Sequence, residues 1–174
     1  PDEDGPAPLP ETAALSLLKM LDDSRIEDAA KAARGLDDDD PLTSYARASL
    51  AFHQGDYSAA LEALPEPTEH PDIERKIAYL RRNIEGAARA TDGMLERVEG
   101  NFKLRFAPTA DAILVDYALD ALEGQRTYMA RLLGQVPPGP TLVEFMPDVE
   151  AFLAASGLPP RDGTRGGTRR HDDA

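Results

Sequence analysis

The chain has 174 residues, no cysteine, and a formal net charge of −13 from 32 acidic and 19 basic side chains. The lack of cysteine excludes disulfide bonds, thiolate catalysis and cysteine-ligated zinc. The excess of negative charge repels phosphate backbones, so nucleic acid is not expected as a partner. No apolar run approaches the ~20 residues that a membrane-spanning helix needs, and none is predicted.

The first part of the chain is predicted to be helical and repetitive after a short acidic lead. Residues 1–10 are rich in proline and acid, and we expect them to be disordered. Two alanine-rich helix–turn–helix units follow, and they can be superimposed. Ile26 corresponds to Tyr57 and Ala29 to Ala60, at an offset of 31 residues. This spacing is close to the ~34-residue period of tetratricopeptide units.

The second unit carries the clearer motif, AFHQGDYSAAL over residues 51–61. Gly55 relieves a tight turn, the ring of Tyr57 can pack across the hairpin, and Ala60 allows a close helix approach. The motif resembles a tetratricopeptide repeat, and the resemblance covers residues 12–65. It implies binding of a protein or peptide partner through the first helix of this unit. The residues we expect there are Tyr45, Ser49 and His53.

The next segment has a long helical period. Apolar residues recur at steps of three and four: Ile73, Ile77, Leu80, Ile84, Ala87, Thr91, Leu95 and Val98. Pro71 suits a helix start and Gly100 a position just past a helix end. The pattern predicts one helix over 71–98 that caps the repeats, within a helical domain over 11–100.

Residues 101–160 predict a β-α-β-α unit. Phe102–Phe106 alternates apolar and charged residues, as a half-buried strand does. A helix is expected from Thr109 to Leu133, a second strand over 141–145, and a short helix over 148–155. The predicted fold class is therefore α+β, with the two strands in one sheet.

This second part resembles the start of a peptidase-MA-like, or gluzincin, domain. The resemblance rests on the Phe-x-Leu-x-Phe strand, the helix with Ala118–Glu123, Leu133-Gly134 before a proline loop, Leu142–Phe145, and Phe152 through Pro159. It implies a thermolysin-like fold whose zinc is held by a His-Glu-x-x-His helix lying beyond Pro160. The resemblance also leans towards a bacterial periplasmic or secreted location, with the cytoplasm as the alternative.

No zinc motif is present in this chain. Its three histidines are His53, His70 and His171, and none begins a His-Glu-x-x-His pattern. No catalytic residue, metal ligand or cofactor is therefore predicted here, and zinc is expected only in a full-length family member.

The last segment, residues 161–174, is rich in Gly, Arg, Asp and Thr and is predicted to be disordered. Two explanations stay open: reading of the gene out of frame near residue 160, or a natural basic tail. A sheet truncated there leaves an exposed strand edge, which favours self-association.

Other polar clusters give weaker signals. Asp37–Asp40 lacks the glycine and glutamate of an EF-hand loop and reads as a linker with a capping aspartate. His171, Asp172 and Asp173 offer metal donors without supporting residues. Glu144 and Asp148 lie near a strand end, where acid–base groups often occur.

Three functions follow from these patterns. The first is the non-catalytic N-terminal portion of a repeat-containing, gluzincin-like metallopeptidase that binds proteins or peptides. The second is a complete small interaction adaptor, and the third is an enzyme that uses the Glu144 region.

Overall fold

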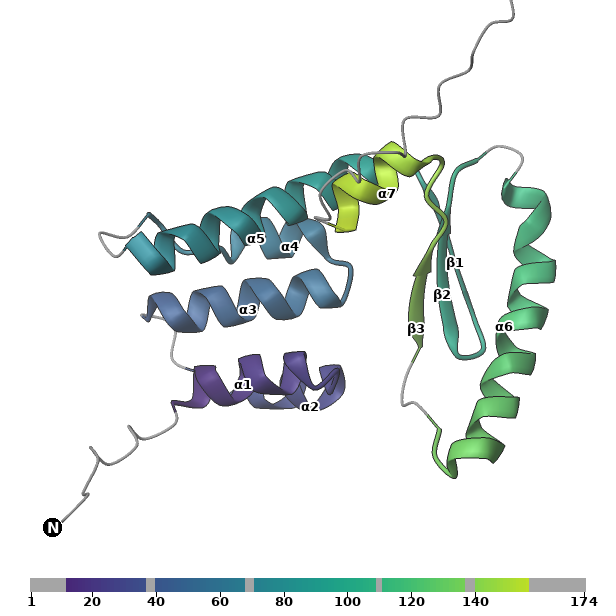
Figure 1. The fold of residues 1–174 in the computed structure, drawn as a ribbon, viewed down its shortest axis with the longest axis horizontal. Coiled ribbons are helices and arrows are strands. Elements are labelled where there is room, and N and C mark those ends of the chain that lie inside the picture. The colour runs from purple at the N-terminus through teal and green to yellow at the C-terminus, as the bar shows by residue number, and fades with distance from the viewer. Residues whose placement is uncertain (1–11, 37–39, 68–70, 109–110, 137–139, 157–174) are drawn as a thin grey trace, which may run out of the picture.

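The computed structural model describes residues 12–36, 40–67, 71–108, 111–136 and 140–156 (Figure 1). Within these ranges the chain is α+β, as predicted, with seven helices and one three-stranded sheet. The predicted disorder of 1–10 and 161–174, and the clusters at Asp37–Asp39 and His171–Asp173, lie outside the described residues, as does His70. No described helix has the length and apolar character needed to cross a membrane.

The helical half consists of two helix–turn–helix hairpins and a third long helix. The hairpins are α1 (Ala13–Asp22) with α2 (Ile26–Ala33), and α3 (Pro41–His53) with α4 (Tyr57–Glu62). In Figure 1, α1, α3 and α5 (Pro71–Ala90) are stacked, with their ends towards the sheet. Positive φ angles at Ser24 (59°) and Gly55 (73°) reverse the chain between the paired helices.

Side-chain caps define where these helices begin. Thr12, Asp40 and Asp56 each accept a hydrogen bond from a backbone N–H of the first turn of α1, α3 and α4, at 3.0–3.3 Å. Such caps are each worth about 1 kcal/mol. The prediction of a capping aspartate in the acidic linker is confirmed at Asp40.

Small residues bring the helices together. Leu17, Ala29 and Ala46 are fully buried between α1, α2 and α3. Ala48 and Ala60 are fully buried where α3, α4 and α5 meet. A larger side chain at any of these alanines would push two helix backbones apart.

The single helix predicted over 71–98 is wrong in its last turns. α5 ends at Ala90, where the Thr91 hydroxyl donates to the Ala87 carbonyl and Gly93 turns the chain at φ 71°. Leu95–Glu99 form strand β1 instead. Leu95 and Val98 fit a helical period, but three residues apart in a strand they face opposite sides, and both are exposed. The sheet therefore begins inside the range 11–100 assigned to the helical domain.

The sheet has the order β1-β2-β3. β1 pairs antiparallel with β2 (Phe102–Phe106) through a turn in which Gly100 has φ 56°. β3 (Thr141–Glu144) pairs in parallel with β2, and α6 (Asp111–Leu133) connects the two. The predicted β-α-β run is confirmed, with β1 as an additional strand.

The two faces of the sheet are covered by different elements. Phe102, Leu104 and Phe106 are buried against Val115 and Leu119 of α6. The opposite face is turned towards the helical hairpins (Figure 1). This division leaves the alternate, charged residues of β2 on the side of the helices.

The last helix, α7 (Val149–Ser156), packs across α5. Their backbones meet at Gly86, where a Cβ atom would lie 2.0 Å from the carbonyl oxygen of Ala154. Only glycine allows this contact. Gly124 in α6 is also helical, but a Cβ atom there would meet nothing within 4 Å.

This contrast predicts opposite effects of the same substitution. Gly86→Ala should lower the free energy of unfolding by about 1–3 kcal/mol, because α7 has to move away from α5. The matched control Gly124→Ala should raise it by up to about 1 kcal/mol, since alanine favours helix. Urea denaturation measures both. Equal stability of the two variants would contradict the close α5–α7 contact.

Candidate functional site

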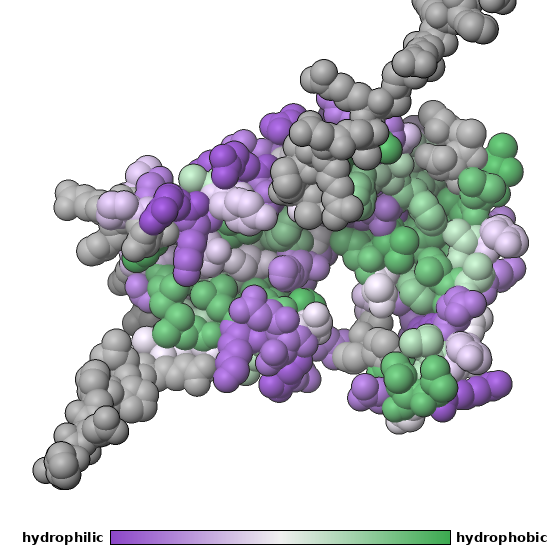
Figure 2. All heavy atoms as spheres, viewed as in Figure 1, coloured by the Kyte–Doolittle hydropathy of each residue, from purple (hydrophilic) through white to green (hydrophobic). Residues whose placement is uncertain are grey.

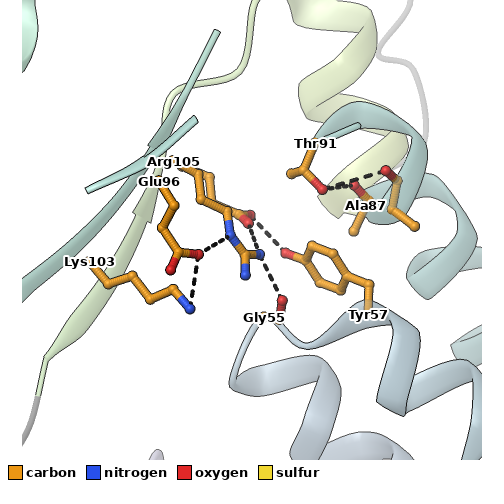
Figure 3. A network of polar contacts seen from close by, with 9 residues as sticks. Gly55, Tyr57, Ala87, Thr91, Glu96, Lys103 and Arg105 are labelled. Atoms are coloured by element: carbon orange, nitrogen blue, oxygen red, sulfur yellow. Dashed lines mark hydrogen bonds and ion pairs between the residues drawn. The ribbon is translucent and has the colours of Figure 1, made fainter. Parts of the chain in front are cut away.

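The junction between the helical hairpins and the sheet holds three side-chain hydrogen bonds whose partners lie 39, 50 and 87 residues apart in the chain. Lys103 and Arg105 alternate with the residues of β2 that are buried against α6, and so they lie on the other face of the strand. Figure 3 shows both side chains on the side of the turn between α3 and α4. Glu96 of β1 and Glu144 of β3 stand opposite Arg105 in the sheet register and so share its face. Three strands thus present charged groups to one helical turn.

Arg105 is the centre of this junction. Its Nη1 donates to the Gly55 carbonyl at 2.7 Å and to Glu144 Oε1 at 3.0 Å. Its Nε donates to Glu96 Oε2 at 3.1 Å, and Lys103 Nζ lies 2.9 Å from the same oxygen. The guanidinium also lies 5.6 Å from the centre of the Tyr57 ring. One side chain, 16% exposed, therefore links the α3–α4 turn to β1 and β3.

Gly55 is required twice in this arrangement. Its positive φ turns the chain, and its missing side chain leaves room for the sheet. A Cβ atom there would lie 2.3 Å from Leu142 Cδ2 and 3.0 Å from Arg105 Nη1. The glycine expected for a repeat turn is thus also the point at which the sheet touches the helices.

Tyr57 and Glu144 complete the junction. The Tyr57 hydroxyl donates to Glu144 Oε2 at 2.8 Å. Burial raises the pKa of Tyr57, and the hydrogen bond and charge of Glu144 raise it further, so the hydroxyl remains a donor. Burial opposes the charge on Arg105, but its bonds to Glu96 and Glu144 outweigh this and raise its pKa. The hydrogen bond from Lys103 is the main cause of the lowered pKa of Glu96.

The two carboxylates considered as catalytic candidates both have structural partners. Glu144 accepts from Tyr57 and from Arg105, one bond on each oxygen. Asp148 Oδ1 accepts the backbone N–H of Ala151 at 2.8 Å and so caps α7. Their geometry favours a role in holding the fold.

A cleft of about 590 Å³ lies beside the junction. One wall comes from the α1–α2 hairpin, another from the end of α3, and the third from Lys103 and the start of β3. Its lining residues are Ser24, Ile26, Glu27, Ala30, His53, Gln54, Lys103, Pro140, Thr141 and Leu142. We call it the hairpin–sheet cleft.

A second hollow shares Ser24 and Thr141 with this cleft, has a volume of about 690 Å³, and extends to Met129 and Leu133 of α6.

β3 is an edge strand of the described sheet, and it pairs with β2 alone. Because parallel pairing uses alternate residues, the backbone N–H and C=O of Leu142 point away from β2.

The three residues expected to bind a partner follow one another along one face of α3, at steps of four residues, but differ in exposure. Ser49 is 8% exposed, and its hydroxyl donates to the Tyr45 carbonyl at 2.9 Å. Tyr45 is half-buried against the cluster around Ala48 and Ala60, and burial raises its pKa. His53 is exposed at the end of α3 and lines the hairpin–sheet cleft. The binding role of all three stays a prediction.

Lys103, Arg105 and Leu142 were not predicted from the sequence as site residues. The alternation of Phe102–Phe106 contained a signal for the first two. Once three apolar residues of that strand face one core, the two basic residues between them must face another element.

Neither a metal-binding cluster among the described residues nor a related protein was found. No group of three or more His, Asp or Glu side chains within the described ranges is arranged to hold a metal ion. Comparison of the chain with protein-family models, with curated proteins and with solved structures gave no match.

Tyr57→Phe tests the junction directly. Removing the hydroxyl takes one hydrogen bond from a partly buried carboxylate, so the free energy of unfolding should fall by about 1–2 kcal/mol. Tyr79→Phe on α5 is the matched control, because Tyr79 is 51% exposed, and it should change stability by less than about 0.5 kcal/mol. If chemical denaturation showed equal effects of the two substitutions, the hydrogen bond from Tyr57 to Glu144 would not stabilise the fold.

The protonation of His53 gives a second test. Although part of the His53 side chain is exposed, the walls of the cleft remove water from the ring, and this desolvation lowers its pKa below the usual 6.5. The nearby Asp22 charge opposes the shift only in part. The unfolded chain therefore takes up a proton first, and stability falls as pH falls through 6.5 towards the folded pKa. An NMR titration of the ring should give a value below 6.5. A value above 6.5 would mean that Asp22 dominates.

Proposed function

We propose that the chain is the non-catalytic N-terminal portion of a tetratricopeptide-containing, gluzincin-like protein, and that it binds a protein or peptide partner. The observation that carries the binding role is the hairpin–sheet cleft, which His53 lines together with β3. The α3–α4 hairpin supports the likeness to a tetratricopeptide repeat. It has Gly55 in its turn, the rings of Tyr57 and Phe52 with centroids 5.8 Å apart, and the fully buried Ala60.

The partner that fits this cleft is an extended peptide. A segment running beside β3 would reach the outward backbone groups of Leu142 and extend the sheet by one strand. Main-chain hydrogen bonds of this kind supply affinity, and the pockets beside the strand supply specificity.

The walls of the cleft indicate which side chains would be preferred. Ile26, Ala30 and Leu142 form an apolar part that suits a small aliphatic side chain. Glu27 and His53 are exposed at the rim and can pair with polar groups on either side. We therefore expect a peptide with one aliphatic residue flanked by polar ones.

Selection of displayed peptides against the purified chain tests this function. Selected peptides should bind Glu27→Arg and His53→Glu at least tenfold more weakly, because both changes reverse or add charge at the rim without touching the core. Thr127→Glu is the control, an exposed change on α6 outside the cleft, and it should leave binding unchanged.

Failure to recover any binder would contradict the proposal. So would peptides that bind both rim variants as tightly as they bind the original chain. Circular dichroism on each variant checks that the helices remain folded.

A further inference from the structure

The solvent side of α6 carries an apolar stripe that nothing in the described structure covers. It lies opposite Val115 and Leu119, which are buried against the sheet. The stripe consists of Leu114, Tyr117, Ala121, Gly124, Tyr128 and Leu132. Its four large side chains are 58%, 76%, 61% and 65% exposed, in chain order. Figure 2 shows hydrophobic atoms gathered on the side of the molecule where α6 lies.

The spacing of the stripe is that of a helix–helix seam. Its members follow one another at steps of three and four residues, as apolar positions do in coiled coils. Ala121 and Gly124 occupy the middle, and a Cβ atom at Gly124 would meet nothing within 4 Å. A second helix can therefore approach closely there, with Tyr117 and Tyr128 as anchors on either side. Exposed tyrosines of this kind are enriched at protein interfaces.

The charges of α6 indicate which helix fits. Asp116 and Asp120 lie in its first half and Arg131 lies in its second half, whereas Glu123 and Arg126 between them pair with each other. Two copies side by side in the same direction would set like charges together. Two antiparallel copies set the acidic half of each against the basic half of the other, which is favourable.

We propose that two copies of the chain associate through this stripe, with their α6 helices antiparallel about a twofold axis between Ala121 and Gly124. The axis sets Tyr117 of each copy opposite Tyr128 of the other. It also brings Leu114 beside Leu132 of the second copy. Arg131 comes close to Asp116 of the second copy, whose exposed carboxylate also pairs with Arg97 of its own chain. The interface is isologous, so it closes with two copies. The hairpin–sheet cleft lies on the side of the sheet opposite α6, so this dimer leaves it open.

Sedimentation velocity over micromolar to millimolar concentrations tests the association. The chain should sediment as a dimer at the upper end of this range. The double variant Tyr117→Lys, Tyr128→Lys should be monomeric throughout, with the dissociation constant raised at least a hundredfold. Tyr79→Lys is the matched control, since this exposed tyrosine lies on α5, and it should still dimerise.

Cysteine pairing tests the direction of the helices, because the chain has no cysteine of its own. Leu114→Cys and Leu132→Cys chains are prepared separately, mixed, and oxidised. Antiparallel helices should give the mixed 114–132 disulfide well above the two symmetric products. Parallel helices would give the symmetric products instead.

Three results would overturn the proposal. The first is a monomer at every concentration, and the second is a preference for symmetric disulfides. The third is a dimer that persists in the double lysine variant, which would move the association to another surface such as the expected strand edge. Circular dichroism of the lysine variant must show the helix content of the original chain, since both substitutions are at exposed positions.

Discussion

The packing of the helical hairpins on the sheet depends on one guanidinium. It belongs to β2 and bridges β1, β3 and the α3–α4 turn. Arg105 contacts the Gly55 carbonyl, Glu96 and Glu144, from positions 50, 9 and 39 residues away in the chain. A partly buried cation of this kind is stabilising only while its partners stay in place. These contacts hold the α3–α4 turn over the sheet, beside the hairpin–sheet cleft.

The sheet has one apolar face and one charged face, and different elements pack on each. Its apolar face is closed by α6 through Leu104 and Val115, both fully buried. Its charged face meets the helical hairpins through a few polar contacts, which leave room for a cleft between them. The same helix that seals the apolar face turns an uncovered stripe to solvent. Peptide binding and self-association are therefore proposed on opposite sides of the sheet, where neither blocks the other.

Sequence patterns predicted the local elements and missed the contacts between them. The α3–α4 hairpin and the strand at Phe102–Phe106 were found because turn glycine and strict alternation are local signals. β1 was missed because Leu95 and Val98 continued a helical spacing. No local sequence signal showed that Gly93 and Gly100 lie on either side of a hairpin strand. The burial of Ser49 and the exposure of His53 depend on how neighbouring helices pack, which periodicity in one helix does not determine.

If Arg105 sets the distance between the helical hairpins and the sheet, removal of its charge must change that distance. The most direct test is the distance between spin labels at Lys19 on α1 and Thr127 on α6, both exposed, with labelled chains diluted in unlabelled ones. We expect one narrow distance distribution in the original chain, and a broad or shifted one after Arg105→Met, which keeps an unbranched side chain but removes the charge. The same narrow distribution in both proteins would contradict this role of Arg105.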